Sequence, residues 1–457
     1  MKRFSPRFRR EPVPESEGSR EMSTIPPPQP SKGLLRAFSS LRLRNFRLYW
    51  FGQMISLLGT WMQRVGQAWL VLELTHSAWQ LGLVGTLQYL PVLLFSIFGG
   101  VLADRWSKRR ILLVTQSVDA IQAVLLWILI ITGTIQTWHI YVLATVLGLT
   151  NSLDQPTRSA FVIEMVGREE LPNAVALNSS LLNLTRIVGP GLAGILIAAL
   201  GTPPLFLLNA LSFLAVILAL LLIDSRKLHI QALPTGGGGE QQNTWRSLRE
   251  GIDYARKTLA VALIIVVVGL VLLFAANFDV LLPLFATDVL HVGARDFGFL
   301  SASIGIGSVI AALWLAWSNL RPTISRILIG ILVLCGLEVV FAVIHIYPLS
   351  LLLIASCGAT ETIAGTLTFT ILQTVAPDHL RGRVISIYIL FFTGSAPLGF
   401  LLAGWLSSLY GASDALLICA LLGIVVAGAG WIWWRLAEKN LENQHNCREV
   451  VKTNIYP

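Results

Sequence analysis

The chain contains uninterrupted apolar runs of membrane-spanning length, and this feature constrains its fold more than any other. Residues 259–276 form a run of 18 residues when Gly269 is counted, and residues 415–434 form a run of 20. A helix needs roughly 20 apolar residues to cross a hydrocarbon core about 30 Å thick. The runs do not alternate in polarity and are too long for barrel strands. We therefore expect an all-α integral membrane protein.

The composition leads to the same expectation. Only 13% of the 457 residues are charged, 54% are hydrophobic, and the mean hydropathy is +0.69. A soluble globular chain carries about 25% charged residues, because it needs polar side chains to cover its surface. The apolar content also excludes disorder of the whole chain.

Proline, glycine and charged clusters divide the sequence into twelve predicted spans, six in each half. Their expected ranges are 47–72, 79–103, 111–132, 138–157, 175–200, 203–223, 259–286, 297–318, 322–344, 347–374, 384–408 and 412–436. The corresponding domains are a disordered basic N-terminal tail (1–43), an N-terminal six-helix bundle (44–223), a central cytoplasmic loop (224–258), a C-terminal six-helix bundle (259–436) and a cytoplasmic C-terminal tail (437–457). Two halves with a weak internal repeat predict a transporter with its site between them.

The basic residues are distributed very unevenly across this predicted topology. Of the 34 Lys and Arg, 31 fall on one side of the membrane, and only Arg295 falls on the other. The positive-inside rule then places both termini in the cytoplasm of a multi-pass protein of the cell membrane. Because topology accounts for the net charge of +9, we do not expect nucleic acid to be a partner. In the central loop, Gly236–Gly239 predict a flexible linker, and residues 247–257 predict a short helix.

The loop after the second span carries the most recognisable motif, "GGVLADRWSKRRILL". It resembles the signature of the major facilitator superfamily, Gly-x-Leu-Ala-Asp-Arg-x-Gly-Arg-Lys, although Ser107 replaces the second glycine. The candidate gating residues are Gly100, Asp104, Arg105, Lys108 and Arg109. A glycine permits close helix approach, and a carboxylate is stabilised at a helix N-terminus. The resemblance implies a cytoplasmic gate that holds an outward-open state, whereas ordinary inside-positive charge would explain only the basic residues.

The fifth span reads "NLTRIVGPGLAGIL". It resembles the Gly-Pro-x-x-Gly-Gly element of exporters in this superfamily, with Ala193 in place of the first paired glycine. Its candidate residues are Arg186, Gly189, Pro190 and Gly194. Proline removes a helical hydrogen bond, and the resulting kink, with small residues on one face, permits sliding against a neighbour. A simple packing motif is the alternative.

Further segments resemble the branch that contains the enterobactin exporter and related secretion and drug-efflux carriers. They are "LRNFRLYWFGQMISLLGTWMQ", "LELTHSAWQLGLVG", "DQPTRSAF", "LPNAVALNS" and "LRGRVISIY". The similarity extends from about Asn45 to Gly404. It implies the twelve-helix, two-bundle fold and an export function, but it does not identify a substrate.

Polar and charged residues inside the spans indicate a central cavity. A charge at the bilayer centre costs about 2.5–3.5 kcal/mol on insertion scales, so it usually faces a partner or water. In the first span, Gln53, Ser56, Thr60, Gln63 or Arg64, and Gln67 share one helical face. The fifth span repeats the pattern with Ser179, Asn183, Arg186 and Pro190. The candidates for substrate binding or proton coupling are Gln53, Arg64, Gln67, Asp119, Asn183, Asp279 and Glu361, together with Arg186. Structural ion pairs between helices are the alternative.

No Gly-x-x-x-x-Gly-Lys-Ser/Thr loop, His-Glu-x-x-His motif or nucleophile elbow is present in the sequence. We therefore expect no enzyme, no catalytic residues, no cofactor and no metal site. The predicted function is export of a small organic molecule by proton antiport and alternating access, by a monomer in the bilayer. Two alternatives stay open, namely an importer or passive facilitator of the same fold, and a non-transporting membrane sensor or interaction protein.

Overall fold

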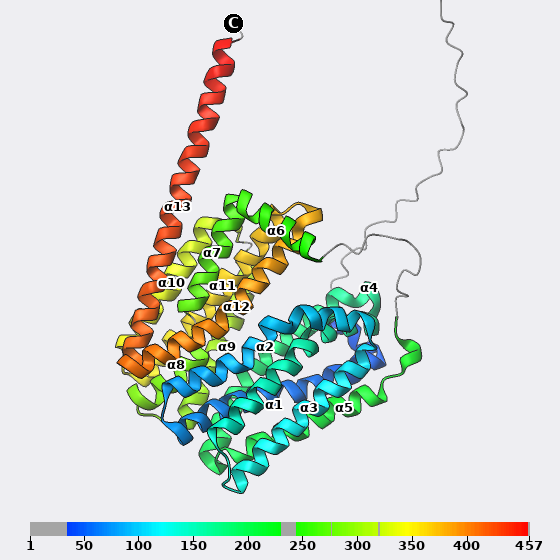
Figure 1. Ribbon diagram of the computed structural model, residues 1–457. Coiled ribbons are helices and arrows are strands. Elements are labelled where there is room, and N and C mark those ends of the chain that lie inside the picture. Colours follow the sequence, from blue (N-terminus) through cyan, green and yellow to red (C-terminus); the bar gives the residue numbers. More distant parts are fainter. Residues whose placement is uncertain (1–33, 230–243, 276, 319, 456–457) are drawn as a thin grey trace, which may run out of the picture.

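The computed structural model describes residues 34–229, 244–275, 277–318 and 320–455, and it is built from helices (Figure 1). The first half comprises η1 (Leu34–Arg42), α1 (Arg44–Thr75), α2 (Ala78–Arg105), α3 (Lys108–Ile131), α4 (Thr137–Leu200), α5 (Pro203–Leu222), η2 (Ser225–Lys227) and α6 (Thr244–Lys257). The second half comprises α7 (Leu259–Phe274), α8 (Phe278–Leu284), η3 (Phe285–Val289), α9 (Ala294–Ser318), α10 (Ile324–Val343), α11 (Tyr347–Val375), α12 (Asp378–Tyr410) and α13 (Ala412–Ile455).

These helices provide the twelve predicted spans. Within the described residues, ten helical segments are long and apolar enough to cross a membrane. One of them, α4, has 64 residues and contains two spans joined at Gly167, where φ is 71° and the backbone leaves helical geometry. The remaining span is α1, whose 32 residues fall short in hydropathy because polar side chains follow one face. The fold is therefore the twelve-helix arrangement that the sequence predicts.

The seventh predicted span is not one continuous helix. It is divided into α7, α8 and the π-helix η3, with Ala275 and Asn277 outside regular helix. The side chain of Asn277 donates to the carbonyl oxygens of Leu273 and Phe274, each at 3.0 Å. These bonds satisfy carbonyls that the break leaves without helical partners. Asp279 consequently lies in the first turn of a new helix, α8.

The two halves form two bundles that converge at one end and diverge at the other (Figure 1). Where they converge, α2 packs against α12 and α4 packs against α9. Glycines allow this close approach, since a Cβ on Gly298 would lie 2.7 Å from the Cα of Gly194. Between α2 and α12, a Cβ on Gly404 would lie 3.0 Å from the Cα of Gly82. We call this end of the molecule the closed end.

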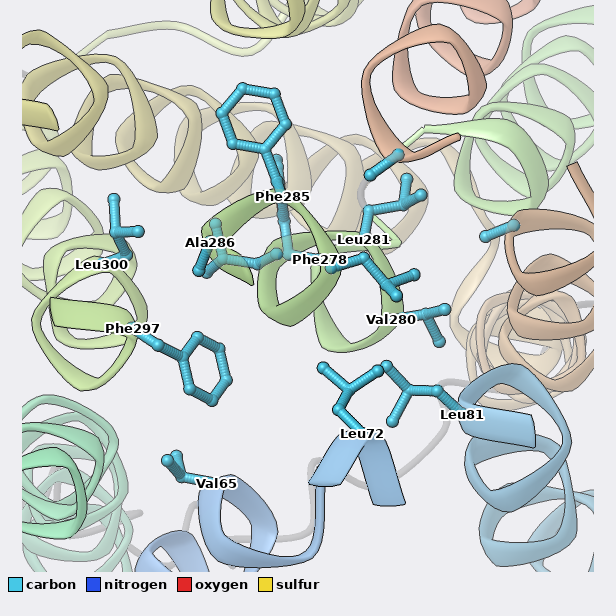
Figure 2. Packing of buried hydrophobic residues seen from close by; sticks show 14 of the residues in the cluster. Val65, Leu72, Leu81, Phe278, Val280, Leu281, Phe285, Ala286, Phe297 and Leu300 are labelled. Carbon is cyan, nitrogen blue, oxygen red and sulfur yellow. The ribbon is translucent and has the colours of Figure 1, made fainter. Parts of the chain in front are cut away.

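Among the described residues, the buried apolar side chains form one core shared by both bundles and one further large core in each bundle, and Ala123, Ala210 and Phe213 form a small cluster inside the N-terminal bundle. The shared core contains Phe278, Phe285 and Phe297 from the C-terminal bundle, and from α1 it contains Met62, Val65, Leu70, Val71 and Leu72. Figure 2 shows side chains of α1 and α2 facing those of α8, η3 and α9. The separate cores lie at the opposite ends of the same helices, with Phe46 of α1 in one and Val384 of α12 in the other. We call that end, where no core is shared among the described residues, the open end.

Two segments outside the bundles differ in how well they were predicted. Residues 34–42, expected within a disordered tail, instead form η1, and Ser40 donates from its hydroxyl to the side-chain oxygen of Asn173 at 2.8 Å. The helix expected near residues 247–257 is present as α6, where Tyr254 donates to the carbonyl oxygen of Val375 at 3.2 Å. The N-terminal residues 1–33 and the predicted linker Gly236–Gly239 lie outside the described residues.

Candidate functional site

A central cavity with a volume of about 360 Å³ lies between the bundles and is lined by charged residues from both of them. It lies next to the shared core, midway along the helices. Residues of both bundles line it, and the polar and aromatic ones include Trp61, Arg64, Gln67, Gln88, Tyr89, Arg186, Asn277, Asp279, Phe297, Ser301, Glu361, Phe392, Ser395 and Phe400. Such a volume lies within the usual range for small-molecule sites.

Arg64 projects from α1 onto the cavity wall. Its guanidinium carbon lies 4.6 Å from the ring centroid of Trp61 and 5.8 Å from that of Tyr89, which are cation–π distances. Its Nε atom is buried and has no hydrogen-bond partner among the described residues. Tyr89 and Asp279 are close enough to act on its charge. Arg64 therefore presents an incompletely partnered cation to the cavity.

A second arginine forms an ion pair between the bundles. Arg186 of α4 and Glu361 of α11 approach to 4.0 Å between Nη2 and Oε2, with side chains 36% and 30% exposed. Asp279 also acts electrostatically on Glu361. The cavity thus contains two cations from the N-terminal bundle opposite two carboxylates from the C-terminal bundle. A proton on either carboxylate would remove one attraction between the bundles.

The polar face of α1 divides between the cavity and the interior of its own bundle. Gln63 donates to Gln122 at 3.0 Å and accepts from Asn209 at 2.6 Å, both inside the N-terminal bundle. Gln63 therefore belongs to a structural network, whereas Arg64 and Gln67 reach the cavity wall. The helical period alone could not distinguish Gln63 from its neighbour Arg64.

Three predicted cavity residues do not line the cavity. Gln53 is buried within the N-terminal bundle, and Asn183 is half-buried but absent from the wall. Asp119 is buried between α3 and α4, where it accepts a hydrogen bond of 2.5 Å from Thr150. Neighbouring helices of the same bundle contact these positions, so a polar residue in a span need not face the centre of the protein.

The gating motif lies at the open end, and the described part of it is held within the N-terminal bundle. Lys108 pairs with Glu164 of α4 at 2.7 Å. Arg109 donates to the hydroxyl of Ser225 at 2.7 Å and to the carbonyl oxygen of Leu221 at 2.9 Å. These contacts do not cross to the other bundle. The side chains of Asp104 and Arg105 lie outside the described part of the chain.

The close helix approach expected at Gly100 occurs one residue earlier in this structure. A Cβ on Gly100 would have no neighbour within 4 Å, whereas a Cβ on Gly99 would collide with the backbone of α4 at Ser152. Gly100 is thus free of packing constraints in this arrangement of the bundles.

The predicted motif in the fifth span contributes to three different contacts. Gly189 packs against α1, because a Cβ there would lie 3.4 Å from the carbonyl oxygen of Leu58. Pro190 reaches the cavity wall beside Arg186. Gly194 lies at the closed end against Gly298 of α9. The small residues therefore adjoin both bundles.

The sequence interpretation missed several residues of the cavity wall. Tyr89, Gln88 and Asn277 were not proposed, yet each lines the cavity. A signal existed for Asn277, which is a polar residue two positions before Asp279 in an otherwise apolar span. Tyr89 had no comparable signal, since aromatic residues in spans are common in packing and at interfaces.

Comparison with known proteins identifies relatives along most of the chain. Residues 35–454 match the protein family described as transmembrane secretion effector. The staphyloferrin A transporter of Staphylococcus aureus is 28% identical over 78% of this chain and 87% of its own length. The multidrug efflux pump Tap of Mycolicibacterium fortuitum is 25% identical over 82% of this chain and 92% of its own. The enterobactin exporter EntS of Escherichia coli is 28% identical over 74% of this chain and 79% of its own.

Solved structures share the fold at low sequence identity. A bacterial homologue of the human lysosomal transporter Spinster, described as inward-facing and unoccupied, has a TM-score of 0.69 at 11% identity, covering 88% of this chain and 97% of that one. The nucleoside transporter NupG has a TM-score of 0.65 at 15% identity, covering 86% of this chain and 99% of that one. These likenesses support the fold alone.

Proposed function

The chain belongs to the transmembrane secretion effector family of the major facilitator superfamily, and on this premise we propose that it exports a small organic molecule by proton antiport and alternating access. Its relatives include proteins described as a siderophore transporter, a siderophore exporter and a drug efflux pump. The cavity between the two bundles is the substrate site of this proposal.

Alternating access is supported by the unequal ends of the molecule. The bundles share a core at the closed end and have separate cores at the open end. In this proposal a substrate in the central cavity enters or leaves through the open end only. Rocking the bundles around this cavity would exchange the open and closed ends.

We propose that the open end faces the cytoplasm. Lys108 and Arg109 lie there, as do Arg44 at the start of α1 and Arg383 at the start of α12. Positive charge in short loops is retained on the cytoplasmic side during insertion. This orientation places both termini in the cytoplasm of a multi-pass protein of the inner or plasma membrane.

One observation carries the coupling proposal, namely the Arg186–Glu361 contact between the bundles on the cavity wall. Antiport requires that proton and substrate not be carried together. Glu361 and Asp279 meet this requirement if a proton and a hydrogen-bond donor of the substrate compete for the same carboxylate oxygens. Inward movement of one proton supplies about 2.3 kcal/mol per 100 mV of membrane potential, which can drive export against a gradient.

In this proposal the gating motif acts when the open end closes. Lys108 and Arg109 would exchange their present partners for groups on the C-terminal bundle, and Asp104 would approach the N-terminus of α12. The favourable position of an anion at a helix N-terminus supports the role of Asp104. Arg105 and Gly100 would face the same seam, and the open space beside Gly100 leaves room for that approach.

The proposal is tested with everted membrane vesicles that carry a pH gradient. Addition of a transported compound should dissipate the gradient in vesicles with wild-type protein. Asp279→Asn keeps the shape of the side chain but cannot exchange a proton, so we expect at least a tenfold slower response. Asp414→Asn, an exposed position at the start of α13, is the matched control and should stay within twofold of wild type.

Unchanged proton movement with Asp279→Asn would remove this residue from the coupling mechanism. Substrate flux without any proton movement, even for wild type, would replace the antiporter with a passive facilitator. Binding of a compound without flux in either direction would favour a membrane sensor instead. Expression of each variant in the membrane is verified by immunoblotting.

A further inference from the structure

A second pocket lies between the bundles at the closed end, with a volume of about 480 Å³. Glu73 and His76 line it from the end of α1, whereas Asp288 lines it from η3 and Ser407 from α12. Among the described residues, its wall and that of the central cavity have no residue in common. The transport site proposed above therefore does not account for it.

The wall of this closed-end pocket is acidic. Glu73 accepts one hydrogen bond of 2.7 Å from the indole N–H of Trp69, and Asp288 accepts one of 2.7 Å from Thr287. Within the described residues, neither carboxylate has a cationic group within 4.0 Å, and neither Lys nor Arg lines the pocket. Carboxylates from opposite bundles thus face one volume whose described wall holds no Lys or Arg and a single imidazole, that of His76.

A buried hydroxyl in the same wall has an unmet hydrogen-bonding requirement. Ser407 is only 7% exposed, and its Oγ has no hydrogen-bond partner in the described structure. The adjacent Ser408 donates to the carbonyl oxygen of Trp405 at 2.7 Å. A buried hydroxyl without a partner costs about 1–3 kcal/mol, and such a group commonly marks a place for a ligand or a bound water.

The chemistry of the wall favours an organic cation over a metal ion. No group of three or more His, Cys, Asp or Glu in the described chain is arranged to hold a metal. A pocket of this size suits a ligand of several heavy atoms. An ammonium group has three donors and no acceptor, so it matches two carboxylates and the lone pairs of a serine hydroxyl.

We propose that the closed-end pocket binds a small organic cation with a primary amine, and that this ligand holds the closed end together. The walls come from both bundles, so the complete site exists only while this end is closed. A ligand that binds one conformation shifts the population toward it. The occupied protein would therefore stay open on the opposite side and turn over more slowly.

The test is calorimetric titration of the purified full-length protein with putrescine. Wild type should show saturable binding, and the double variant Glu73→Gln/Asp288→Asn should bind at least tenfold more weakly. Ser407→Ala should weaken binding about threefold, because one acceptor is lost. Glu73 is exposed, so Glu73→Gln alone preserves the fold and should still weaken binding if the double variant does not fold.

The central-cavity variant Asp279→Asn separates this proposal from the proposed transport function. It should bind putrescine within twofold of wild type, whatever it does to transport. Absence of saturable binding to wild type, or equal affinity of the Glu73 and Asp288 variants, would overturn the proposal. Loss of binding in Asp279→Asn would place the amine in the central cavity. Binding of Mg²⁺ to the same carboxylates more tightly than putrescine would also contradict the proposal that the ligand is an organic cation.

Discussion

The closed and open ends of this protein are built on different interactions, although the same long helices run through both. At the closed end, α1 contributes Met62, Val65 and Leu70–Leu72 to a core that includes Phe278 and Phe297 of the other bundle. At the open end, α1 contributes Phe46 to a core of its own bundle. The charged residues there, such as Lys108 and Glu164, pair within the bundle.

This difference indicates which contacts the proposed change of access would have to exchange. The closed end is stabilised mainly by apolar contacts between closely packed backbones, which require no charged partner. At the open end, charged groups such as Lys108 and Glu164 are paired inside their own bundle. In the proposed closure they would form new pairs between the bundles. Steric changes should therefore affect the closed end most, whereas charge changes should affect the cavity and the open end.

The largest expected effect comes from a methyl group between the backbones of the closed end. In Gly298→Ala, the new Cβ would lie 2.6 Å from the carbonyl oxygen of Pro190 and 2.7 Å from the Cα of Gly194. Overpacking costs about 1–3 kcal/mol, and the upper value corresponds to a roughly hundredfold shift away from the closed state. Spin-label distances across the closed end should lengthen, and transport should fall accordingly.

The control for this prediction is Gly336→Ala in α10. A Cβ there has no neighbour within 4 Å, so only helix propensity changes and transport should stay near wild type. Equal distance distributions for Gly298→Ala and wild type would show that the closed end accommodates the added methyl group without separating, and this would contradict the prediction.

The second prediction concerns the ion pair across the cavity. Glu361→Arg alone places two cations opposite each other, and we expect transport to fall on the order of tenfold, which equals about 1.4 kcal/mol. The exchange Arg186→Glu/Glu361→Arg restores opposite charges and should recover part of the activity. The exposed pair Arg435–Glu438, at 3.6 Å in α13, provides a matched exchange that should have no effect. A double variant no better than the single variant would argue against a direct interaction.

The third prediction tests a single hydrogen bond between the bundles at the closed end. The hydroxyl of Thr86 in α2 lies 2.9 Å from the carbonyl oxygen of Pro397 in α12 and 2.8 Å from that of Gly82 in its own helix, so its one proton is shared between two acceptors. Thr86→Val keeps the shape but removes the donor, with an expected loss of about 1 kcal/mol, or about fivefold in the population of the closed state. Thr145→Val removes a bond within α4 only, and the same spin-label measurement should not respond to it.

The smallest expected effect is at the open end. The side chains of Lys108 and Glu164 are 18% and 17% exposed. Because the amide of Gln can still donate a hydrogen bond to Glu164, Lys108→Gln should reduce stability by only about 1 kcal/mol. If the pair stabilises the open state, the variant should shift access modestly, by about two- to fourfold in cysteine-labelling rate within the cavity. Arg226→Gln, at an exposed position in η2, serves as the control. A shift as large as that of Gly298→Ala would contradict the proposed difference between the ends.

Most of the fold follows from the sequence because each span needs about 20 apolar residues. The first span, α1, was also predicted, although its polar face lowers its hydropathy, and that face places Arg64 and Gln67 on the cavity wall. The break between α7 and α8 was not predicted, although the apolar run ends at residue 276 and Asn277 and Asp279 follow it. Its position depends on Asn277 bonding to the carbonyls of Leu273 and Phe274, which is a contact of the folded chain.

The candidate site was predicted less completely, for a physical reason. Periodicity identifies the polar face of a helix, but it does not say whether that face meets the cavity or a helix of the same bundle. Arg64, Asp279 and Glu361 reach the cavity, whereas Asp119 is satisfied by Thr150 within its bundle. Charged residues with long side chains were located better than short polar ones.

The arrangement of the three cores also has a consequence for biogenesis. Each separate core is built from one half of the chain, so the core around Phe46 can form before the second half leaves the ribosome. The shared core includes both Met62 of α1 and Cys419 of α13, and it is complete only after the last span has been inserted. Until then, the first bundle presents an unpaired apolar surface within the bilayer. A truncated chain would keep that surface, which makes it a natural target for membrane quality control.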